Sequence, residues 1–221
     1  MRLGRGAQPT PQDDSARRTT ASEKGRVKAD PESGIWIPCP PRFPDGYDAE
    51  SWSRLAATVW WEHSRLPHAD NGVDVLAAVF RGMRETGYKY IRSSQFWLYL
   101  RDPATQPLSV YICAFRQQGD LDQRLRVLTG ADDAESVRKP KVAKVSTNNL
   151  GTGLRAARYH AQDDKGTLLC ILSYAFRVEE YETDLQVFTS STDLRALKAA
   201  GDDIERFVQS ITVQAKTGAG R

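Results

Sequence analysis

The sequence predicts an α+β fold in which helices flank an antiparallel β-sheet, an α/β/α sandwich. Three observations favour this fold. Helical apolar spacing occurs at residues 49–86 and 191–211, and strand patterns fill the part between. Short turns join successive strand segments, whereas parallel neighbours would need a crossover of a dozen or more residues. The chain has 221 residues, 40% of them hydrophobic, which is enough to bury one core.

Residues 1–34 are expected to form a disordered basic tail. Up to residue 33 the large apolar side chains are Met1, Leu3 and Val27, so burial cannot offset the entropy of ordering this segment. Through Lys28 the tail holds seven basic and three acidic residues, while the whole chain has a net charge of +3. The rest of the chain is therefore close to neutral, and the basicity concerns the tail.

A proline-rich arm opens the ordered part of the chain. Residues 35–44 combine apolar side chains with four prolines, which forbid a helix and favour an extended arm along the edge of the domain. Asp48 then caps a helix over residues 49–64, because apolar side chains follow it at helical spacing. A second helix begins near Asp70 or Asn71 and ends where Gly87 takes the C′ position.

Strand patterns follow the second helix. Strands are predicted at residues 88–100, 108–115, 142–146, 154–162, 167–178 and 184–189, with a short helix at 120–129. The turn at residues 163–166 has the composition of a hairpin connection.

Two short helices close the domain. Ser191 or Thr192 caps the first, and Asp202-Asp203 opens the second, on which Ile211 faces inward. One domain is therefore expected over residues 35–214, followed by a disordered C-terminus at 215–221.

The last third of the chain resembles the Mog1/PsbP-like family. The resemblance rests on VSTNNLGTGL at residues 145–154, on LLCILSYAFRV at 168–178, and on a final helix that ends in FVQSI at 207–211. The family includes small actinobacterial proteins of unknown or adaptor function. The resemblance implies an α/β/α sandwich with a binding role, although fold alone does not establish function.

The chemistry-bearing residues do not form a recognisable catalytic or metal site. His63 and His68 are five positions apart across Pro67, whereas a metalloprotease helix needs a gap of four. Cys113 and Cys170 lie in apolar strands and are read as small buried hydrophobes. We therefore expect no catalytic residue, metal or cofactor.

Two further groups of residues bear on reactivity and charge. Cys39 has Arg42 nearby, which could lower its thiol pKa, but it has no histidine neighbour to make a nucleophile pair. The basic cluster at residues 138–144 has no interleaved aromatic residues, unlike a platform that stacks nucleic-acid bases.

Aromatic residues of the first half of the chain are the candidate partner-binding residues. All five tryptophans lie there, and Trp60 and Trp61 are adjacent on one helix, about 100° apart around its axis. One of the two therefore lies off the core stripe, either beneath the arm or in a partner interface. Trp36, Arg42, Phe43 and Trp61 are accordingly predicted to contact a protein partner.

The sequence thus favours a non-catalytic adaptor or accessory subunit that binds another protein. The chain has no apolar run of about 18 residues and no secretory signal, so a cytoplasmic location is expected. One alternative is a small-molecule-binding protein or enzyme with an apolar pocket between sheet and helices, lined by Tyr88, Tyr90, Phe96, Trp97 and Tyr99. A second alternative is weak nucleic-acid binding through the basic tail.

Overall fold

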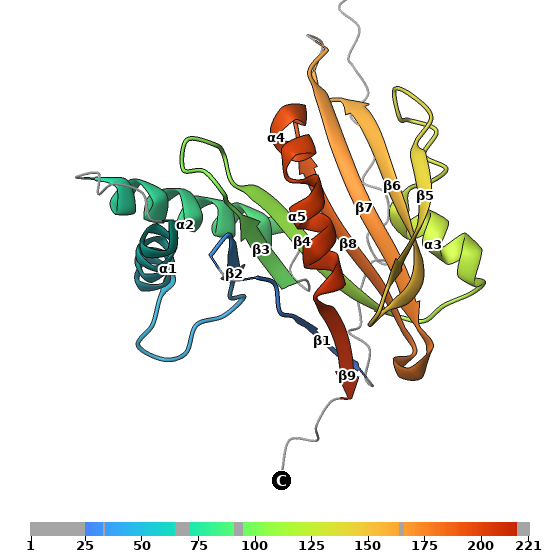
Figure 1. Ribbon diagram of the computed structural model, residues 1–221, viewed down its shortest axis with the longest axis horizontal. Helices are drawn as coiled ribbons and strands as arrows, with labels where there is room; N and C mark the ends of the chain where they lie inside the picture. The colour runs from blue at the N-terminus through green and yellow to red at the C-terminus, as the bar shows by residue number, and fades with distance from the viewer. Residues whose placement is uncertain (1–24, 33, 65–70, 91–94, 164–165, 216–221) are drawn as a thin grey trace, which may run out of the picture.

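The computed structural model describes residues 25–32, 34–64, 71–90, 95–163 and 166–215 (Figure 1). The strands are β1 Gly25–Ala29, β2 Trp36–Cys39, β3 Gln95–Tyr99, β4 Leu108–Arg116, β5 Lys141–Thr147, β6 Gly151–Ala161, β7 Leu168–Val178, β8 Thr183–Ser191 and β9 Ile211–Ala215. The helices are α1 Ala49–Ser64, α2 Gly72–Tyr90, α3 Leu121–Thr129, α4 Leu194–Ala199 and α5 Gly201–Gln209, with a 3-10 turn, η2, at Glu179–Tyr181.

The described strands form one large antiparallel sheet and one small one. The large sheet has seven strands in the order β2-β3-β4-β8-β7-β6-β5, and β1 pairs with β9 in a two-stranded sheet. Helices α4 and α5 cover one face of the large sheet, which we call the α5 face (Figure 1). The α1–α2 pair and α3 pack on the opposite face, which we call the α3 face. This arrangement confirms the α/β/α sandwich with an antiparallel sheet.

Helix α5 is fastened to the sheet by packing and by a buried carboxylate. Its Phe207 is fully buried and lies 4.2 Å, centroid to centroid, from the Trp36 ring of β2. Asp203, at the start of α5, accepts hydrogen bonds from Tyr99 Oη at 2.7 Å and from Arg101 Nη2. The pKa of Tyr99 is raised to about 12, mainly because the side chain is buried and also because it faces the Asp203 carboxylate. The tyrosine therefore remains a hydrogen-bond donor at physiological pH.

The α1–α2 pair packs on the other face at the β2–β3 end. The indole Nε1 of Trp60 donates a 2.8 Å hydrogen bond to the carbonyl of Leu100, and Phe80 of α2 is fully buried. Gly87 does not end α2, which continues to Tyr90. A Cβ at this glycine would lie 2.6 Å from Phe96 Cε1, so the absence of a side chain allows the helix to approach β3 closely. The predicted C′ role of Gly87 is therefore wrong, and Tyr88 is helical instead of extended.

Three predicted boundaries near the chain ends are also wrong. Residues 25–29, assigned to the tail, form β1 and pair with β9, burying Val27 and Ala29. Ile211 begins β9 and does not belong to the last helix. The N-cap of α4 is Asp193, whose carboxylate accepts from two backbone N–H groups, and not Ser191 or Thr192. The predicted disorder of residues 1–24 and 216–221 lies outside the described residues.

Candidate interaction site at the basic edge of the sheet

The predicted partner-binding residues do not form one surface. Trp36 is buried between Phe207 and Tyr99 on the α5 face, so its side chain is a core group, and partner contact by it remains a prediction. Phe43 and Trp61 are half-buried and pack against the core under the α1–α2 pair. Of the four, only Arg42 is exposed.

The proline-rich arm is fastened to α2 by Arg84. The guanidinium donates to the carbonyls of Pro40 at 2.9 Å and Pro41 at 3.2 Å, and it lies 4.2 Å from the centroid of the Phe43 ring. Burial raises the pKa of the Cys39 thiol far above its ordinary value, and the charge of Arg84 offsets only part of this effect. The thiol is therefore neutral and not poised as a nucleophile.

The aromatic pocket considered from the sequence is not assembled. Side chains alternate along β3, so Phe96 packs on the α3 face, while Trp97 and Tyr99 pack on the α5 face. Tyr88 meets Phe96 edge to face at 5.7 Å, and both belong to a packed core. The side chain of Tyr90 is outside the described part of the structure. The described members of the set therefore lie on two sides of the sheet.

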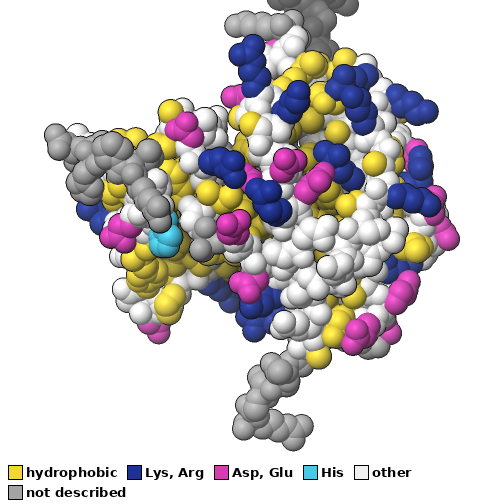
Figure 2. Space-filling view, in the orientation of Figure 1, with side chains coloured by type: hydrophobic (Ala, Val, Ile, Leu, Met, Phe, Trp, Pro, Cys, Tyr) yellow, Lys and Arg dark blue, Asp and Glu magenta, His cyan; other side chains and the backbone are white. Residues whose placement is uncertain are grey.

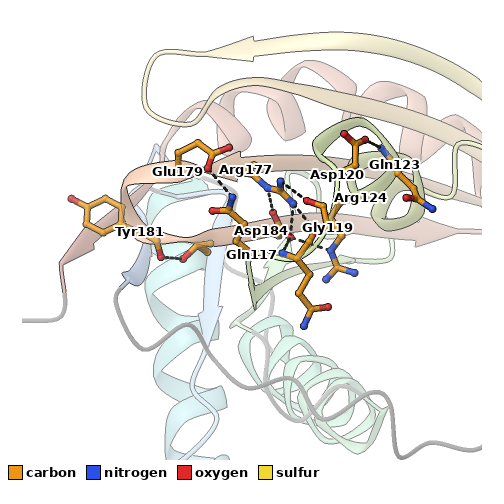
Figure 3. Close-up of polar contacts among 11 residues, drawn as sticks. Gln117, Gly119, Asp120, Gln123, Arg124, Arg177, Glu179, Tyr181 and Asp184 are labelled. Carbon is orange, nitrogen blue, oxygen red and sulfur yellow. Dashed lines mark hydrogen bonds and ion pairs between the residues drawn. The ribbon is translucent and has the colours of Figure 1, made fainter.

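A polar hollow of about 480 Å³ lies where the β4–α3 loop meets the β7–β8 connection, and Figure 3 shows the polar contacts beside it. Its lining residues are Arg116, Gln117, Gln118, Gly119, Glu179 and Glu182. Asp184, fully buried beside it, accepts from Arg177 Nε at 2.7 Å, from Arg124 Nε at 3.1 Å and from the backbone N–H of Gln118 at 3.1 Å. Arg177 also donates to the carbonyls of Gln118 and Gly119. These groups satisfy one another, so the network holds the loop in place.

A different kind of surface lies at the far edge of the large sheet. Strand β5 is the last strand in the described order, and the side chains at residues 141–144 are all exposed. Between residues 138 and 144 the chain carries four cations and no acid: Arg138, Lys139, Lys141 and Lys144. Figure 2 shows Lys and Arg side chains gathered on the side of the molecule where β5 and β6 lie. We call this strand, with its preceding basic residues, the basic edge.

Helix α5 and the β5–β6 turn hold one end of the basic edge. Gln209, the last residue of α5, donates to the carbonyl of Ser146 at 3.1 Å and accepts through its own carbonyl from Asn149 Nδ2 at 3.1 Å. The Thr147 hydroxyl accepts from the backbone N–H of Leu150 at 2.8 Å. The end of the strand is therefore fixed to the helix layer.

Asp133 holds the loop that leads into the other end. Its carboxylate accepts from Arg158 Nη1 at 3.0 Å, and His160 Nε2 lies 2.9 Å from the same oxygen. Burial alone would raise the pKa of Asp133, but the backbone N–H of Glu135 and the charges of His160 and Arg158 outweigh it and lower the pKa. His160, expected at the surface or as a cross-strand partner, is half-buried in this ion cluster.

Contacts to Tyr159 complete this attachment. The Ser136 hydroxyl donates to the Tyr159 carbonyl at 3.1 Å, and the backbone N–H of Val137 donates to the same oxygen at 2.7 Å. The guanidinium of Arg138 lies 3.8 Å from the centroid of the Tyr159 ring. The sequence gives no sign of this cation–aromatic contact, because the two residues are 21 positions apart. These contacts fasten the loop at residues 136–138 to β6.

The described part of the chain contains no group of three His, Cys, Asp or Glu side chains that could hold a metal ion. None of its helices is long and apolar enough to cross a membrane. What the basic edge offers is an outer row of backbone N–H and C=O groups, together with cations, for another chain to pair with.

Comparison with known proteins gives matches among solved structures. No family model and no curated protein matches the chain. LpqN of Mycobacterium tuberculosis, described as involved in cell envelope biogenesis, aligns over 90% of this chain and 87% of its own, with 8% identity and a TM-score of 0.48. The Ran-binding protein Mog1p of Saccharomyces cerevisiae aligns over 56% of this chain and 82% of its own, with 9% identity and a TM-score of 0.35. Mog1 is one of the two proteins that give their names to the family that the sequence resembles, and at these TM-scores the likeness carries no inference about function.

Proposed function

We propose that this protein is a protein-binding adaptor or accessory subunit that captures an extended segment of its partner along β5. The observation that carries the proposal is the basic edge itself, a seven-residue strand at the end of the sheet, exposed along most of its length and fixed at both ends. Adding a strand to such an edge is a common way to bind a peptide, because the backbone groups are already aligned.

Energetics indicate what kind of binding this edge supports. Each main-chain hydrogen bond contributes about 0.5–1.5 kcal/mol net, so about five of them give a few kcal/mol. Association costs about 4 kcal/mol or more in translational and rotational freedom. Backbone pairing alone is therefore close to balanced, and side chains along the strand must decide which segment binds.

A second copy of the chain is a poor occupant of the same edge. Antiparallel pairing of β5 with itself would bring Lys141 and Lys144 of each copy close to the same residues of the other. Like charges opposite each other on neighbouring strands are destabilising. Edge lysines are a known means of discouraging self-association. The charge of the edge thus selects against its own copy and for a partner of the opposite sign.

Site-specific photo-crosslinking in the cell of origin tests the proposal. A photoreactive residue replaces Val142 in one variant and Ala143 in another, because these neighbours face opposite sides of β5. Val75 on α2, 60% exposed, is the matched control position. Both β5 variants should crosslink to adjacent residues of one partner segment, and the control should not. Adducts that map to unrelated segments, or that do not exceed the Val75 control, would refute strand capture.

The other functional predictions concern parts of the chain away from β5. Partner contacts by Arg42, Phe43 and Trp61 are compatible with their positions at the surface or near it, and they remain predictions. Nucleic-acid binding by the N-terminal tail concerns residues 1–24, outside the described part. The cytoplasmic location also remains a prediction.

A further inference from the structure

The alternation of β5 divides its side chains between the two faces of the sheet. Val145 packs against the core of the α5 face, so Lys141 and Ala143 lie on that face as well. Val142 and Lys144 lie on the α3 face, where Val142 is paired with Ala156 of β6. Each face of β5 therefore carries one lysine and one valine.

The two valines are partly open to a further strand. Val142 is 39% exposed, and Val145 is half-buried. Val142 also begins a row of directly paired residues that crosses the sheet through Ala156 of β6, Ser173 of β7 and Phe188 of β8. An apolar side chain opposite Val142 would extend this row by one position and bury the exposed part of the valine.

The two lysines carry charge that the described part of the chain leaves unpaired. No acidic side chain there lies within 4 Å of the Nζ atom of Lys141 or Lys144. Glu135, the acid nearest in sequence, forms no ion pair with either lysine, while Asp132 pairs with Arg126 and Asp133 with Arg158. Directly opposite residues of neighbouring strands have Cβ atoms about 4.5–5.5 Å apart, within reach of an ion pair.

We propose that β5 binds an extended acidic segment that carries two Asp or Glu residues three positions apart, each next to an apolar residue. This inference rests on the proposed strand capture and names the partner's chemistry. Every strand pair of the described sheets is antiparallel. In an antiparallel addition the segment reads apolar, acid, any residue, apolar, acid, and these positions face Val145, Lys144, Ala143, Val142 and Lys141 in turn. Arg138 and Lys139 attract further acids beyond its C-terminal end.

The test uses a labelled peptide with the core Val-Glu-Thr-Val-Glu and threonine flanks, measured by fluorescence anisotropy with the full chain. A peptide of the same composition with the second and fourth core residues exchanged (Val-Val-Thr-Glu-Glu) has adjacent acids and tests the pattern, and a peptide with Gln for Glu tests the charge. Lys144→Glu replaces an attraction with a repulsion and should weaken binding about 2- to 30-fold, as should Lys141→Glu. Lys198→Glu, at an exposed position on α4, is the matched control and should leave binding unchanged. Both β5 substitutions are at exposed positions, and unchanged thermal unfolding will show that the variants are folded.

A charge swap makes the result specific. A peptide with Lys in place of Glu should bind the Lys141→Glu, Lys144→Glu double variant better than it binds the native chain. Equal binding of the Glu, Gln and exchanged peptides, with the crosslinks at residue 142 intact, would overturn the acidic pattern and leave strand capture standing. Binding of a DNA oligonucleotide that requires both lysines, without any peptide binding, would overturn the inference in favour of a nucleic acid.

Discussion

Replacing Asp184 with alanine should be among the most destabilising single changes in the described part of the chain. The carboxylate is fully buried, and it accepts from Arg177, Arg124 and the backbone N–H of Gln118. The Arg177 side chain is 4% exposed, so the substitution leaves a guanidinium in the interior without its ion-pair partner. Breaking a buried ion pair by removing one partner costs about 3–5 kcal/mol.

Equilibrium urea unfolding followed by circular dichroism measures this loss. For a domain of this size, a loss of about 3–5 kcal/mol lowers the melting temperature by roughly 6–20 °C. Asp184→Asn keeps the side-chain volume and some of the accepted hydrogen bonds, so its cost should be smaller. Asp122→Ala, at an exposed position of α3, is the matched control and should stay within about 0.5 kcal/mol of the native protein.

A double variant tests the physical reason. Arg177→Met combined with Asp184→Leu removes both buried charges, so it should recover much of the stability that Asp184→Ala loses. A cost below about 1 kcal/mol for Asp184→Ala would show that water or a rearranged loop replaces the carboxylate. The reasoning from burial would then be refuted.

Three further predictions concern other parts of the molecule. Gly153→Ala should destabilise the protein by about 1–3 kcal/mol, measured by urea unfolding, because a Cβ there would clash with the Ala175 carbonyl oxygen. The lowered pKa of Asp133 stabilises the fold above pH about 4, and this stability is lost as the pH falls further, so urea midpoints of the native chain and Asp133→Asn should converge in acid. Parallel midpoints down to pH 3 would contradict that linkage. The raised thiol pKa of Cys39 should leave it unalkylated by iodoacetamide at pH 8 in the native state and reactive in urea, and native labelling would place it outside the core.

Local pattern was enough to predict most of the sheet. Apolar strands such as Leu168–Val178 and the hairpin turn before it appear directly in the sequence, and so does α1 with its Asp48 cap, which accepts from the backbone N–H of Ser51 at 2.8 Å. β1 could not be recognised, because its five residues GRVKA contain one strongly apolar side chain. Its stability comes from pairing with β9, which is 182 or more positions away in sequence. Such pairing leaves no local signal.

The candidate site was harder to predict, for a related reason. The strand at residues 142–146 and its lysines were visible, but whether a strand is central or at an edge depends on the order of all seven strands. The tryptophans were misleading because large aromatic side chains serve cores and interfaces alike. Trp36 lies within the proline-rich arm in sequence, yet it packs on Phe207, 171 positions further along.

The two edges of the large sheet differ in a way that bears on function. β2 has four residues and contains Pro38, which has no N–H to offer to a further strand. The segment that follows it is drawn onto α2 by Arg84. β5 has seven residues, no proline, and side chains that are exposed along most of its length. A sheet that needed only protection from self-association could have a short, proline-bearing strand at both edges. This chain has a short, proline-bearing strand at one edge and a longer, charged strand at the other, so we expect a partner strand to be accommodated on β5.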